Sequence, residues 1–271
     1  MYMPEREWKT VISGGICTNS CTVDLRGVMK CHVSSYQIAN GGVMRTGKQN
    51  TLYDVTVNGN LFASDSWIHK LQVPTGVVSM TGSANASRVF VGGHLDCAGQ
   101  SVLTELEIVS GGKVTMTGNT LARDISVERG GEYSLYGTAS ANQLVISSGA
   151  TVIAYGQTEL NNVHVCSGGR LECYDDTKSY DVYIEEGATF ICHDGAEVVY
   201  TDDSPQKPIT FGTSAACCNS DDGLVHIYRA KVTVFEEKGT IEVQMPVSMD
   251  KVFLGGKVIG ISWKGTEDDK R

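Results

Sequence analysis

Several features that mark common classes of protein are scarce or absent in this sequence. The chain has 271 residues but only 5 prolines, and aromatic residues make up 7% of it. No window of about 18 apolar residues occurs, so no transmembrane helix is predicted. No run of Lys or Arg is longer than two, and the formal net charge is −9. We therefore expect neither nucleic-acid binding nor membrane insertion, and the acidic excess favours solubility.

Catalytic and cofactor-binding motifs are also lacking. The six His are scattered, and no Gly-x-Ser-x-Gly motif supplies a nucleophile. Gly pairs recur at a fixed interval, which indicates architecture rather than phosphate binding. The spacing of Cys17, Cys21 and Cys31-His32 fits no standard zinc pattern. The sequence therefore predicts no cofactor and no metal site.

The compartment is left open by the sequence. Nine Cys make an odd count without small-domain spacing, unlike a disulfide framework. Residues 1–10 are polar and lack the apolar segment of a secretory signal. Two localisations follow as expectations. The chain belongs to a longer exported protein and lies at the cell surface or outside the cell, or it is cytoplasmic.

What the sequence does contain is a repeat of 19 residues. Turns of the form x-Gly-Gly or x-Gly-Ala recur at this interval from Gly92-Gly93 to Glu186-Gly187-Ala188. Apolar residues keep the same register and alternate with polar ones, which predicts short strands with one buried face. The inward columns are Leu106, Ile125, Leu144, Val163 and Val182; Ile108, Val127, Ile146, Val165 and Ile184; Leu95, Val114, Tyr133, Val152, Leu171 and Phe190; Cys97, Met116, Leu135, Ala154, Cys173 and Cys192.

A weaker inward column suggests that each unit has a third short strand and a third side; it consists of Leu103, Ala122, Ala141, Leu160 and Ser179. A unit of this size cannot bury its own inner face, so successive units must stack in parallel. Strand spacing sets a rise of about 4.8 Å per turn. The sequence thus predicts an all-β fold, a single-stranded right-handed parallel β-helix (β-solenoid) with about 19 residues per turn.

The predicted domain boundaries follow from the part of the chain over which the 19-residue repeat continues. The β-helix is expected over residues 1–200, with regular repeats over 89–195 and degenerate repeats before them, whose turns include Ser13-Gly14-Gly15 and Asn40-Gly41-Gly42. Thr201–Pro208 contains two Pro and cannot continue a ladder. Residues 201–271 are predicted to form a C-terminal β cap, with a hairpin around Glu236–Gly239 and a mobile tail.

The repeat unit LEIVSGGKVTMTGNTLARD, residues 106–124, resembles the passenger repeats of AIDA-type autotransporter adhesins. The resemblance covers roughly residues 38–195. It implies a β-helix, display on a bacterial surface and a role in adhesion. Because one fold serves many functions, this functional expectation is an analogy.

An outward column of aromatic residues is the first candidate site. Tyr136, Tyr155 and Tyr174 occupy equivalent positions on successive turns, and His193 follows one turn later. Stacked rings of this kind either stabilise the solenoid as an aromatic ladder or form a flat platform that binds sugar rings.

An acidic pair is the alternative candidate site. Asp175 and Asp194 lie one turn apart, and carboxylates at about 5 Å serve retaining glycoside hydrolysis or hold calcium. Both occupy positions that hold Gly in earlier turns, which favours solvated corner residues.

The function that these patterns favour is a non-catalytic rod for surface display or adhesion, with a glycan or a host surface as its partner. Two alternatives remain open. One is a β-helix enzyme that cleaves polysaccharides with Asp175 and Asp194. The other is a phage tail-spike-like fragment, which would form trimers. The sequence does not indicate an oligomeric state.

Overall fold

The computed structural model describes residues 10–18, 21–28, 30–185, 188–192 and 196–199, together with short strands that follow residue 209. Contacts within the chain divide it into two units. One comprises Met1–Ile125 and Gly130–Tyr133, and the other comprises Ser126–Arg129 and Ser134–Arg271. Each unit is described by itself.

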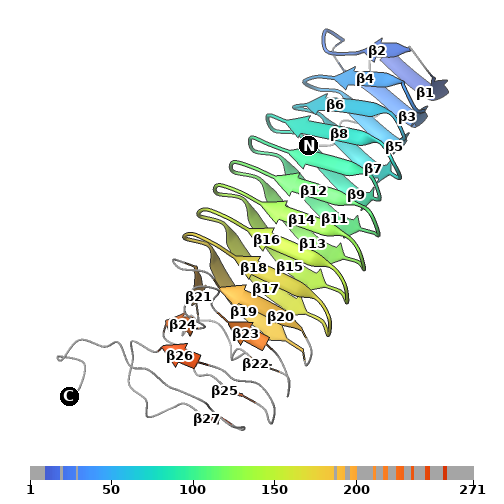
Figure 1. Cartoon of the computed structure of the whole chain (residues 1–271). Helices are drawn as coiled ribbons and strands as arrows, with labels where there is room; N and C mark the ends of the chain where they lie inside the picture. The colour runs from blue at the N-terminus through green and yellow to red at the C-terminus, as the bar shows by residue number, and fades with distance from the viewer. Residues whose placement is uncertain are drawn as a thin grey trace. The chain divides into compact units, whose positions relative to one another are not determined.

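The fold is an all-β parallel β-solenoid of about nine turns with about 19 residues per turn, and the described residues form no helix. Each regular turn contributes one long strand and one short strand (Figure 1). Accordingly, the described residues include no helix that is long and apolar enough to cross a bilayer.

In the first unit, two parallel sheets are built from alternating strands. The long strands pair in the order β1 (Thr10–Cys17), β3 (Cys31–Ile38), β5 (Thr51–Val57), β7 (Trp67–Val73), β9 (Asn85–Val91) and β11 (Val102–Ile108). The short strands pair in the order β2 (Thr22–Asp24), β4 (Val43–Thr46), β6 (Asn60–Ser64), β8 (Val77–Thr81), β10 (His94–Cys97) and β12 (Lys113–Met116). Strands β13 (Leu121–Val127) and β14 (Glu132–Leu135) contain residues of both units.

The second unit repeats this arrangement. Its long strands are β15 (Ser140–Ile146), β17 (Glu159–Val165), β19 (Lys178–Ile184) and β21 (Glu197–Val199). Its short strands are β16 (Thr151–Ala154), β18 (Arg170–Cys173) and β20 (Thr189–Cys192). Each residue of a long strand pairs with the residue one repeat unit later in the sequence, as Leu144 does with Val163. Residues of similar type therefore lie side by side on neighbouring strands.

Short strands continue beyond residue 209: β22 (Thr210–Phe211), β23 (Ala216–Cys218), β24 (Leu224–Tyr228), β25 (Thr233–Val234), β26 (Glu242–Gln244) and β27 (Phe253–Leu254). Strand β24 pairs with β26 in parallel, with Leu224 opposite Glu242. The expected hairpin stays a prediction, because its turn lies outside the described residues. Glu236–Gly239 and the tail Lys264–Arg271 lie outside the described residues.

The predicted inward columns form the core. Ile108, Val127, Ile146, Val165 and Ile184 are fully buried, and so are the members of the Gly-flanking column from Leu95 to Phe190. Cys97 and Cys173 are also buried, as expected of thiols packed like small apolar side chains. The side chain of Cys192 lies outside the described residues.

The third side of each turn is present, but it is part of the long strand. In β11, Leu103 and Leu106 both point inward although two residues separate them, because Glu105 between them has a φ of 53°. The ladder passes over this residue: Thr104 pairs with Ser87 and Leu106 with Val89. The expectation of three separate strands is therefore wrong, since one left-handed residue bends a single strand.

The Gly turns are confirmed for the regular repeats. Gly111, Gly130, Gly149 and Gly168 have φ between 74° and 81°, which favours glycine. The following Gly112 is needed for space, because an added Cβ would lie 2.1 Å from the carbonyl oxygen of Val91. The prediction of a turn at Ser13-Gly14-Gly15 is wrong, since these residues lie inside β1.

Candidate functional site

The three predicted tyrosines lie together on the second unit. Tyr136, Tyr155 and Tyr174 each follow directly after a short strand, namely β14, β16 and β18. Backbone hydrogen bonds continue the ladder at this position, because the N–H of Tyr155 donates to Leu135 O and that of Tyr174 donates to Ala154 O, both at 2.9 Å. We call these three residues the tyrosine stripe.

The rings of the tyrosine stripe are stacked. The ring centroids of Tyr136 and Tyr155 are 5.2 Å apart with an interplanar angle of 2°. Those of Tyr155 and Tyr174 are 4.5 Å apart with an angle of 14°. These distances match the predicted rise, and they show that the turns are in register at this corner.

Stacking decides which ring atoms reach the solvent. Each ring covers a face of the next, so the middle ring of Tyr155 has both faces covered and presents an edge and its phenol group. Tyr136 is 39% exposed. The expected flat platform for sugar rings is therefore not what this geometry provides, because a platform requires open faces. The stripe offers a row of ring edges and hydroxyl groups.

A small polar network fixes one end of the stripe. The hydroxyl group of Tyr174 donates to Glu172 Oε2 at 2.6 Å, and Arg170 Nε donates to Glu172 Oε1 at 2.6 Å. The hydrogen bond to Glu172 is the main cause that raises the pKa of Tyr174, so this phenol remains protonated at neutral pH. A locked, neutral ring is a rigid contact surface.

Asp175 follows the stripe as a corner residue. Its φ is 54°, like the left-handed Gly137 and Gly156 in earlier turns, and its Oδ2 accepts a hydrogen bond of 3.0 Å from the N–H of Gly156. The carboxylate thus holds the corner of the preceding turn. Asp194 and His193 lie outside the described residues.

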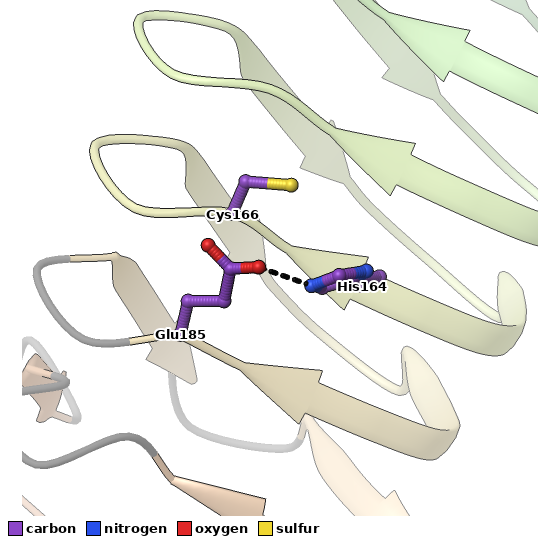
Figure 2. Close-up of side chains that lie close together, drawn as sticks. All are labelled: His164, Cys166 and Glu185. Atoms are coloured by element: carbon purple, nitrogen blue, oxygen red, sulfur yellow. Dashed lines mark hydrogen bonds and ion pairs between the residues drawn. The ribbon is translucent and has the colours of Figure 1, made fainter.

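A second cluster, which the sequence did not predict, lies on the outer face of the long strands. His164 is in β17, Cys166 follows that strand, and Glu185 follows β19. Each residue offers one atom that could bind a metal: an imidazole nitrogen of His164, the thiol sulfur of Cys166 and a carboxylate oxygen of Glu185. These three atoms all lie within 4.8 Å of one another. Figure 2 shows the three side chains converging from two successive turns. We call them the His-Cys-Glu cluster.

Hydrogen bonds orient the carboxylate of this cluster. His164 Nε2 and Glu185 Oε1 are 2.8 Å apart (Figure 2). The N–H of Ser167 donates to Glu185 Oε2 at 2.9 Å. The Ser167 bond, and then the His164 bond, lower the pKa of Glu185. The ring of Tyr183 packs edge-on against His164, with centroids 4.8 Å apart.

Partial burial, followed by the charges of Glu185 and Glu128, raises the pKa of Cys166. Glu128 belongs to the same outward column, where it accepts hydrogen bonds from Ser126 Oγ at 2.5 Å and from Ser147 Oγ at 3.3 Å. The Glu185 carboxylate therefore lies close to a partly buried thiol, and Glu128 lies two turns earlier in the same outward column.

The repeat register holds the signal that would have revealed this cluster. Cys166 and Glu185 occupy equivalent positions of successive repeats and hence stack, while His164 lies on the same face of the strand as Cys166. This signal lies in outward polar columns, which resemble any solvated face of a strand. Among the described residues, Cys17, Cys21, Cys31 and His32 form no comparable group.

Comparisons with known proteins bear on the fold. No family model matches the chain, and no curated protein matches its sequence. Among solved structures, the chain is similar to a TibA55-350 fragment hyper-glycosylated by TibC, with a TM-score of 0.67 and 15% identity. The match covers 94% of this chain and 97% of the other. At this identity the likeness shows a shared β-solenoid fold.

Proposed function

We propose that this chain is a non-catalytic β-solenoid for surface display or adhesion and that it contacts glycans through the tyrosine stripe. The observation that carries the proposal is the parallel stack of Tyr136, Tyr155 and Tyr174 on the outside of three successive turns. The fold shared with the TibA fragment supports the role in display, and it supports a location at the cell surface.

Glycan contact through this stripe would use hydroxyl groups and ring edges. Saccharides present many hydroxyl groups, and tyrosine combines an apolar body with a polar tip and few rotatable bonds. The regular spacing between rings, 5.2 Å and 4.5 Å, suits an extended chain of similar sugars. This role differs from that of the glycans on the TibA fragment, which TibC attaches to that protein.

The test is binding of the full chain to an array of glycans, comparing the wild type with the double variant Tyr136→Phe, Tyr155→Phe. Phenylalanine keeps the stack and removes the hydroxyl groups, so the thermal midpoint of unfolding should stay within a few degrees. We expect saturable binding by the wild type and a loss of at least about tenfold in affinity for the double variant.

The matched control is Tyr53→Phe, which alters an exposed tyrosine of the first unit that stacks on His69. Its affinity should equal that of the wild type. Equal binding by the wild type and the double variant would show that the stripe is only a stabilising ladder. Absence of wild-type binding to every glycan would refute the glycan part of the proposal.

A further inference from the structure

We propose that the His-Cys-Glu cluster is a binding site for a divalent transition-metal ion, with Zn²⁺ as the ion that its ligands fit best. His164, Cys166 and Glu185 would each supply one ligand atom. The inference does not depend on glycan binding, because it concerns a different face of the second unit and different residues.

The ligand types select the class of metal. Zn²⁺ is bound by thiolate sulfur, imidazole nitrogen and carboxylate oxygen, whereas Mg²⁺ and Ca²⁺ prefer oxygen alone. A thiol beside an imidazole therefore argues against the oxygen-seeking ions. Three protein ligands leave a fourth tetrahedral position for water or another small ligand.

The distances require only small side-chain movements. At ordinary zinc bond lengths, ligand atoms of a tetrahedral site are roughly 3.3–3.6 Å apart. Here the nitrogen and oxygen of His164 and Glu185 are 2.8 Å apart, and all three atoms lie within 4.8 Å. Rotation about the side-chain bonds of Cys166 and Glu185 covers this difference, because both residues are only partly buried.

Neighbouring groups support the ligands from outside. The N–H of Ser167 holds the second oxygen of Glu185, and Tyr183 packs against the imidazole of His164. Contacts of this kind fix the orientation of metal ligands. Glu128, two turns earlier in the same outward column, adds negative charge to this face, which favours a dication.

A bound cation would give the three groups of the cluster a common partner. Without an ion, the pair of His164 and Glu185 is a surface contact that contributes little to stability. A bound dication displaces the thiol proton and gives all three groups one partner.

The experiment uses the purified full chain, stripped of metal with a chelator and titrated with Co²⁺. Cobalt bound through a thiolate shows a sulfur-to-metal absorption band in the near ultraviolet. We expect the wild type to show this band and to lose it when one equivalent of Zn²⁺ is added. Cys166→Ser should lose the band, and Glu185→Gln should lower the Co²⁺ affinity by about tenfold or more.

Cys21→Ser is the matched control, since Cys21 is also a partly exposed free thiol but lies in the first unit. It should bind one equivalent through the same band as the wild type. The unfolding midpoints without metal should agree among all variants, which excludes misfolding as the cause of lost binding. A wild type without the band, or a Cys166→Ser variant that retains it unchanged, would overturn the proposal.

Discussion

Replacement of Ile146 tests the assignment of the inward face most sharply. Ile146 is fully buried at the end of β15, pairs with Val165 of the next turn, and its carbonyl oxygen accepts the N–H of Cys166 at 2.9 Å. Its neighbour Val145 lies on the same strand but is 38% exposed. The two residues therefore differ in which side of the sheet they face, and little else.

The expected magnitudes follow from burial. Ile146→Ala removes buried methyl groups and leaves a cavity, which costs about 2–5 kcal/mol of unfolding free energy. Ile146→Asp should cost more, because it also buries a carboxyl group without a partner between two turns. Val145→Ala should cost less than about 1 kcal/mol, since its side chain is already largely in water.

Urea unfolding followed by circular dichroism measures these differences in free energy. We expect Ile146→Asp to abolish the cooperative transition of the second unit, and Ile146→Ala to shift its midpoint to a clearly lower urea concentration than Val145→Ala does. Equal shifts for Ile146→Ala and Val145→Ala would refute the inward assignment of this column, and with it the register of the repeat.

Four further predictions concern the buried thiol of Cys173 and the turn residues Gly112 and Asp175. Burial raises the pKa of Cys173 to about 12, so this thiol should not react with a disulfide reagent at pH 8, whereas Cys166 should react. Because the protonated thiol is favoured in the folded state, its contribution to stability is complete below about pH 9 and is lost as the pH rises toward 12; Cys173→Ala should flatten this decline in the measured unfolding free energy. Gly112→Ala should lower the unfolding free energy by about 1–3 kcal/mol, as judged by the urea midpoint, since its Cβ would clash with Val91 O. At the left-handed corner, Asp175→Asn should leave the unfolding free energy nearly unchanged, and Asp175→Ala should lower it by about 1–2 kcal/mol, as judged from thermal melts. A larger loss for Asp175→Asn than for Asp175→Ala would contradict the corner role.

The sequence predicted the core of the repeats because stacking places like residues on like. A column such as Ile108, Val127 and Ile146 keeps its apolar character at a constant interval, and the structure buries all three. In the first unit the interval varies. Thr51 pairs with Trp67, and Trp67 pairs with Asn85, so two successive turns differ in length and both are shorter than the regular repeat. A search at a fixed period cannot find the register there.

The bend in each long strand escaped prediction for a different reason. The left-handed position is held by Glu105, Gln143 and Asn162 in described turns rather than by glycine. Such a mixed polar column resembles any exposed column in the sequence. The apolar residues on either side of this position must both face inward, although strict alternation along a strand would place them on opposite faces. The residue between them therefore takes a positive φ.

The candidate sites were predicted in part. The alternation of inward and outward residues along a strand was enough to place Tyr136, Tyr155 and Tyr174 on the outside. Only the orientation of the ring planes reveals that the stripe presents ring edges to the solvent. The His-Cys-Glu cluster depends on two neighbouring outward columns at once, and on the hydrogen bond from Ser167 that orients Glu185.

Protease treatment of intact cells that produce this chain, followed by detection with an antibody against it, tests the proposed role most directly. We expect the protease to remove the chain from intact cells, because a display protein must face the medium. Lysed cells, in which the protease reaches every compartment, serve as the control for cleavage. Complete protection in intact cells, with cleavage after lysis, would contradict surface display and place the chain inside the cell.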